Sequence, residues 1–77
     1  MSEYVHPGDV MVAMGLLLGV ELRESIHGGW YARYPSDGQH LATPNYGSKR
    51  LAMSMALRQM HYQVNDDGTV TPGGNSR

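Results

Sequence analysis

The chain has 77 residues, 40% of them hydrophobic and 17% charged, which suits one folded domain and excludes a disordered segment. It has no cysteine, so disulfides and thiolate metal sites are excluded, and this composition fits a reducing cytoplasm. The net charge of −1 argues against strong, general attraction to nucleic acid or to anionic membranes.

The longest apolar run covers only residues 10–20 and is interrupted by two glycines. A transmembrane helix needs about 20 predominantly apolar residues, so we expect none in this chain. The first residues, Met1-Ser2-Glu3-Tyr4, lack the basic and then apolar pattern of a signal peptide. We therefore expect a protein without membrane association that is located in the cytoplasm of a host cell.

The first predicted element is a helix that starts at Asp9. Asp9 is the expected N-cap, because an aspartate side chain accepts hydrogen bonds from free amide groups and its charge suits the positive end of a helix. Residues 10–18 continue the helix, and Gly19 is a typical stop. Apolar residues cover every side of it, so we expect Met14 or Leu17 to be buried within the monomer or in a homodimer.

Three antiparallel strands are expected next. Apolar and polar residues alternate in the first of them, which is typical of a strand with one buried face. The turn signals are a pair of glycines after His27 and then Asp37-Gly38, a dipeptide that readily adopts positive φ. The buried face of the first strand is expected to consist of Val20, Leu22 and Ile26. The strands are predicted at residues 20–26, 30–34 and 40–43, and Pro44 ends the last of them.

A second helix is predicted over residues 49–60, with Ser48 as its N-cap. Its small and apolar side chains gather on one side, which indicates an amphipathic helix that packs closely on the sheet. That side consists of Ala52, Met53, Ala56, Leu57 and Met60. A turn at residues 65–68 then favours a short hairpin formed by residues 62–64 and 69–71.

These elements predict an α+β fold in which a helix, a three-stranded antiparallel sheet and a second helix form two layers, with an optional short C-terminal hairpin. Residues 1–71 are expected to form a single domain. Residues 72–77 are rich in proline, glycine and polar side chains, which contribute little to a core. We therefore expect them to form a flexible tail.

The order of one helix, three strands and one helix resembles that of the double-stranded RNA-binding domain. The segment Gly-Ser-Lys-Arg-Leu-Ala, from Gly47 to Ala52, is similar to the start of that family's second helix. The resemblance implies that Lys49 and Arg50 contact phosphates across the major groove of RNA, whereas Met53 stands at the family's third basic position.

The same order resembles that of HicA-type toxins, which are small ribonucleases with a histidine at the start of the middle strand. Here Ser25-Ile26-His27-Gly28 stands where that family has Gly-Ser-His. This resemblance implies a ribonuclease in which His27 acts as the catalytic base.

In its general features, although not in any sequence motif, the chain also resembles small phage-encoded inhibitors of anti-CRISPR type. Such inhibitors are small, near-neutral proteins without cysteine, in which helices lie on one antiparallel sheet and no active-site motif is found. This resemblance implies a protein that covers a nucleic-acid-binding surface on a host complex.

The aromatic strand has two different faces. Trp30, Ala32 and Tyr34 share one of them, and we expect Trp30 to be buried because a small domain needs its largest side chain in the core. Tyrosine and arginine on the other face are expected to anchor a partner, since both are enriched at binding hot spots. Together with the basic start of the second helix they give the expected partner-binding set of Tyr31, Arg33, Lys49 and Arg50.

The sequence lacks recognisable catalytic and metal-binding motifs. Among its four histidines, His27 and His40 could approach each other across a hairpin, but no carboxylate stands at ligand spacing. Nucleotide-binding glycine loops and nucleophile elbows are also absent from the sequence. We therefore expect no metal, no cofactor and no catalytic residue, with His27 as the exception if the chain is a ribonuclease.

The charges are divided along the chain. Residues 1–29 carry four acidic residues against one arginine, and residues 30–64 carry four basic residues against one aspartate. Such a polarised molecule can meet complementary patches on a protein partner. We therefore expect a non-enzymatic inhibitor of anti-CRISPR type that binds a protein subunit of a CRISPR surveillance complex, binds nucleic acid weakly or not at all, and is a monomer or a homodimer. An RNA-binding or HicA-like ribonuclease domain is the alternative.

Overall fold

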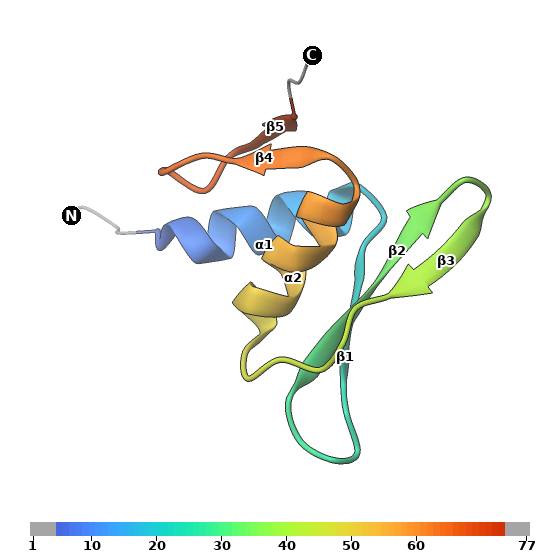
Figure 1. The fold of residues 1–77 in the computed structure, drawn as a ribbon. Helices are drawn as coiled ribbons and strands as arrows, with labels where there is room; N and C mark the ends of the chain where they lie inside the picture. The colour runs from blue at the N-terminus through green and yellow to red at the C-terminus, as the bar shows by residue number, and fades with distance from the viewer. Residues whose placement is uncertain (1–4, 74–77) are drawn as a thin grey trace.

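Two helices and five strands make up residues 5–73, the part of the chain that this computed structural model describes. Figure 1 shows a three-stranded antiparallel sheet, a separate two-stranded hairpin and the two helices between them. The elements are α1 (Pro7–Leu17), β1 (Glu21–Glu24), β2 (Trp30–Ser36), β3 (Gln39–Ala42), α2 (Lys49–Gln59), β4 (Tyr62–Val64) and β5 (Val70–Pro72). The predicted α+β class and the order of elements are confirmed, including the C-terminal hairpin.

The N-cap of helix α1 lies three residues before the predicted one. His6 is its N-cap, because its Nδ1 atom accepts a hydrogen bond of 2.9 Å from the N–H of Gly8. The prediction that Asp9 caps this helix is therefore wrong, and Asp9 lies in the first turn. The physical reason is Pro7, which has no N–H to satisfy and whose fixed φ suits the first helical position. Gly19 follows the helix with a φ of 100°, as its predicted role as a stop requires.

Helix α1 packs chiefly on α2 and on β5. Its buried residues are Met11 and Gly15, and Met53 of α2 lies directly against Gly15. Met14 is half-buried, and its sulfur accepts the N–H of Val70 at 3.3 Å. Leu17, by contrast, is 88% exposed. The helix is thus apolar all round but covered on one side.

The inner face of the three-stranded sheet packs on α2. Ala32 and Tyr34 are buried there, and Trp30 on the same face is half-buried rather than fully enclosed. Strand β1 contributes Leu22, which pairs with Ala32. Ile26 was predicted on this buried face, but β1 ends at Glu24, so Ile26 lies in the following turn with 95% of its surface exposed.

Strands β2 and β3 are joined by a two-residue turn at Asp37 and Gly38, whose φ angles are 51° and 82°. Positive φ at both positions is the geometry of a tight hairpin, as the dipeptide predicted. Beyond β3, Thr43 exchanges hydrogen bonds with Ala32: its N–H donates to the Ala32 carbonyl at 2.8 Å, and its hydroxyl accepts from the Ala32 N–H at 3.0 Å. The chain therefore stays against β2 until shortly before α2 begins.

Helix α2 provides the centre of the core. Ser48 caps it as predicted, since the Ser48 hydroxyl accepts the N–H of Leu51 at 3.2 Å. The predicted apolar side is also confirmed, because four of its five residues are fully buried: Ala52, Met53, Ala56 and Leu57. Met53 and Leu57 are the largest fully buried side chains of residues 5–73.

The β4–β5 hairpin closes the fold over α1. The backbone of Gly68, in its turn, lies against the carbonyl of Pro7, and Val70 is buried. Strand β5 continues to Pro72, and the N–H of Gly73 donates to the carbonyl of His61 at 2.7 Å. Hairpin pairing thus includes Pro72, the first residue of the predicted tail 72–77. Residues 74–77 of that tail lie outside the described residues.

Candidate functional site

One face of the three-stranded sheet is left open by the helices. Side chains alternate along a strand, so the positions next to the buried Ala32 and Tyr34 point away from α2. The strand register adds the corresponding positions of β1 and β3. We call this surface the open sheet face, and it consists of Glu21, Arg23, Tyr31, Arg33, Pro35, His40 and Ala42.

The centre of the open sheet face is a tyrosine beside two arginines that share one carboxylate. Tyr31 pairs with Arg23, and Arg33 pairs with Glu21. The Oε1 atom of Glu21 lies 3.1 Å from Nη2 of Arg23 and 3.8 Å from Nη1 of Arg33. All three charged side chains are about half exposed, so these ion pairs orient the side chains more than they stabilise the fold.

The electrostatics of this cluster keep Glu21 ionised. The hydrogen bond and the positive charge of Arg23 have the largest effects and lower the pKa of Glu21. Desolvation opposes them, and the charges of Arg33 and His40 lower the pKa by smaller amounts. The open sheet face therefore presents two guanidinium groups around a carboxylate, with an aromatic ring alongside. Such a mixture can meet both an acidic group and a hydrogen-bond donor on a partner.

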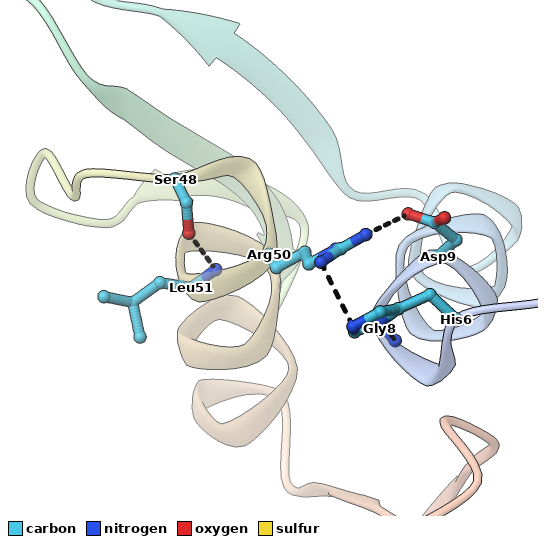
Figure 2. A network of polar contacts seen from close by, with 6 residues as sticks. All are labelled: His6, Gly8, Asp9, Ser48, Arg50 and Leu51. Atoms are coloured by element: carbon cyan, nitrogen blue, oxygen red, sulfur yellow. Dashed lines mark hydrogen bonds and ion pairs between the residues drawn. The ribbon is translucent and has the colours of Figure 1, made fainter.

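The other predicted basic residues lie at the start of α2, where they have partners within the chain. Figure 2 shows Arg50 reaching from α2 to the first turn of α1. Its Nη2 atom lies 3.0 Å from Oδ1 of Asp9, and its Nη1 atom lies 3.4 Å from Nε2 of His6. Lys49 stands over the ring of Trp30, with Nζ 5.2 Å from the ring centroid. Both cations are therefore engaged by side chains of this chain.

Between the two helix starts lies an open groove of about 370 Å³. It is lined by Asp9, Val12, Ser48, Lys49 and Arg50. Because Asp9 sits opposite the two cations, the groove has mixed charge rather than the uniformly positive surface that a phosphate backbone favours.

The four residues predicted to bind a partner thus fall on two surfaces. Tyr31 and Arg33 lie on the open sheet face, whereas Lys49 and Arg50 lie at the start of α2, on the side of the sheet that α2 covers. Glu21 and Arg23 of the open sheet face were not among the predicted site residues. Their position in a polar, alternating stretch pointed outward, but only the register of β1 against β2 brings them to Tyr31 and Arg33.

The histidines do not come together. His27 lies exposed in the turn between β1 and β2, where its backbone N–H donates to the Ser25 hydroxyl at 3.1 Å. His40 pairs with Pro35 near the opposite end of β2, so His27 and His40 do not approach each other across the hairpin. Within residues 5–73 no group of three histidine, cysteine or acidic residues could hold a metal ion. Neither helix of this part is long and apolar enough to cross a membrane.

A scan against protein-family models and searches of curated proteins and of solved structures find no match to this chain. The open sheet face is therefore the feature of this fold from which a function is inferred.

Proposed function

We propose that this chain is a non-enzymatic protein-binding inhibitor that acts in the cytoplasm and docks its open sheet face on a protein subunit of a nucleic-acid-handling complex. The proposal depends on one observation: Tyr31 lies beside Arg23 and Arg33 on a sheet face that no helix or strand of residues 5–73 covers. Tyrosine and arginine dominate binding hot spots, because they offer a rigid ring and a planar set of donors. In the specific form of this proposal, the chain is an anti-CRISPR protein and its partner is a CRISPR surveillance complex.

The charge pattern favours a protein over nucleic acid as the partner. The ionised Glu21 stands between the two arginines, and a row of phosphates placed there would meet its negative charge. A protein surface can instead offer a carboxylate to an arginine and a donor to Glu21. At the start of α2, Asp9 already neutralises Arg50, which leaves few cations there for phosphates.

The experiment is titration calorimetry of the chain against purified subunits of CRISPR surveillance complexes. Arg33→Glu should weaken binding at least tenfold, about 1.4 kcal/mol, because it reverses a charge at the centre of the contact. The matched control is Arg58→Glu, the same change at an exposed position of α2, which should alter affinity less than threefold. Changing both Lys49 and Arg50 to glutamate tests whether the start of α2 also contacts the partner. Absence of binding to every subunit, or equal losses for Arg33→Glu and Arg58→Glu, would contradict the proposal.

One observation supports the alternative, a ribonuclease: His27 is exposed in a turn, where a large substrate can reach it. Under our proposal the wild-type chain does not cleave RNA, and His27→Ala binds the protein partner as the wild type does. RNA cleavage that disappears in His27→Ala would instead support a ribonuclease and overturn the proposed inhibitor.

A further inference from the structure

The two edges of the three-stranded sheet differ in how they are protected. Edge strands carry unpaired backbone groups, and natural proteins protect them with charged side chains. Strand β1 has three charged residues among its four, whereas the four residues of β3, Gln39–Ala42, are all exposed and include none that is formally charged. Figure 1 shows β3 on the outside of a hairpin that extends away from the helices. The edge of β3 is thus accessible and unprotected.

The strand register identifies which backbone groups are free. The N–H of Thr43 donates to the carbonyl of Ala32, so Thr43 occupies a hydrogen-bonded position opposite β2. Hydrogen-bonded and non-hydrogen-bonded pairs alternate in an antiparallel ladder, so Leu41 opposite Tyr34 is the next hydrogen-bonded position. The N–H and C=O groups of His40 and Ala42 therefore point away from β2, towards the open edge.

We propose that two copies of this chain pair through their β3 edges, antiparallel about a two-fold axis that passes between their Leu41 residues. In this register, His40 exchanges both backbone hydrogen bonds with Ala42 of the partner subunit, and the symmetry repeats the exchange. Leu41 then stands opposite Leu41 of the partner subunit in a non-hydrogen-bonded pair, where side chains come closest. The two sheets become one sheet of six strands, without an edge at β3.

This register is self-complementary in chemistry as well as in geometry. Leu41 is 41% exposed, and it is covered by an identical apolar side chain in the dimer. The flanking pairs bring His40 to an alanine and Gln39 to a threonine, so no like charges oppose each other. The exposed pair Leu16 and Leu17 on α1 offers apolar area but no backbone groups that would fix the position of a second copy. Edge pairing leaves the open sheet face uncovered, so this inference does not depend on the proposed function.

The dimer is expected to be weak and reversible. Strands of four residues bury less than the roughly 1,200–2,000 Å² of stable complexes. A covalent trap is therefore the sharpest test, and the chain suits it because it has no cysteine of its own. Non-hydrogen-bonded partners have Cα atoms about 4.5 Å apart, a separation that a disulfide can bridge.

Under mild oxidation, Leu41→Cys should form a disulfide-linked dimer at least about tenfold faster than Leu51→Cys. Leu51 is the matched control, because it is similarly exposed, at 46%, but lies on α2. Equal rates of cross-linking for the two variants would overturn the proposal, since random collisions then account for the dimer.

Sedimentation of the unmodified chain gives the second test. From about 10 μM to about 1 mM, a range that covers weak association, its mean mass should rise towards that of a dimer. Leu41→Lys places like charges opposite each other and should keep the chain monomeric, whereas Leu51→Lys should behave as the wild type. Circular dichroism checks that both variants are folded. A wild-type monomer at every concentration would refute the pairing, and so would a dimer that Leu17→Lys abolishes and Leu41→Lys does not.

Discussion

A single glycine sets the distance between the two helices. Met53 is fully buried and lies directly against Gly15, so the two helices meet at a residue without a side chain. A Cβ atom at position 15 would collide with the sulfur of Met53, which has no solvent-exposed space to move into. Glycine is a poor helix former, so its presence in mid-helix is explained by this close packing.

We therefore predict that Gly15→Ala destabilises the protein by about 1–3 kcal/mol, the usual cost of overpacking a core. Helix propensity alone would change stability by about 1 kcal/mol in the opposite direction. Gly47→Ala is the control, because no atom lies within 4 Å of a Cβ built there. Urea denaturation measures both variants. A Gly15→Ala protein as stable as the wild type would contradict the prediction, because repacking of Met53 would then cost no more than the gain of about 1 kcal/mol in helix propensity.

Residue types in this chain were easier to predict than their partners. Lys49 and Arg50 were identified as basic residues in the first turn of a helix, where positive charge opposes the helix dipole. For Arg50, an ion pair with Asp9 compensates this unfavourable placement, and Asp9 is 41 positions away along the chain. No local pattern indicates such a pair. The N-cap at His6, in contrast, had a local signal, since Pro7 marks a first helical position.

Among the elements, those with one buried face were predicted best. The alternation in β2 and the apolar side of α2 each define which residues face inward, and Ala32, Ala56 and Leu57 are buried as expected. Helix α1 has no such stripe, so its sequence could not indicate that Gly15 is buried while Leu17 is exposed. The packing of α1 on α2 follows from the Gly15–Met53 contact, which joins distant parts of the chain.

The β4–β5 hairpin contacts α1 at Gly68, where both a positive φ and a close approach of two backbones require a glycine. Gly68 has a φ of 90°, and a Cβ atom there would collide with the backbone carbonyl of Pro7, which cannot rotate away as a side chain can. Gly28 has the same φ of 90° but nothing within 4 Å of its Cβ position. Substitutions at these two glycines therefore distinguish the cost of a left-handed backbone from the cost of losing the contact between the hairpin and α1.

We predict that Gly28→Ala costs about 1–2 kcal/mol through its left-handed backbone alone. Gly68→Ala should cost clearly more, because it also prevents the hairpin from lying on α1. Hydrogen exchange gives a direct readout: the amide of Val70, which donates to Met14, should lose protection in Gly68→Ala and retain it in Gly28→Ala. Equal stability and equal protection in the two variants would show that the contact with Pro7 does not hold the hairpin.

In the molecule as a whole, α2 is the element that the other parts share. It contacts the sheet at β2, the first helix and the β4 strand, and its Met53 and Leu57 are the largest fully buried side chains of the described residues. Neither the sheet nor α1 has another large core to fold around. We therefore expect the domain to unfold in one cooperative step, with a free energy of unfolding of about 4–12 kcal/mol for its size.

Two probes on different elements test this cooperativity. Trp30, the one tryptophan of the sequence, reports on the sheet by fluorescence, and far-ultraviolet circular dichroism reports mainly on the helices. Their urea transitions should coincide. Leu57→Ala should remove about 2–5 kcal/mol and shift both transitions equally, because the cavity lies in the shared core. The exposed neighbour Arg58→Ala should change stability by less than about 0.5 kcal/mol. If Leu57→Ala shifted the helical signal and left the Trp30 transition unchanged, the sheet would be stable without α2, and the shared core would not be what holds the domain together.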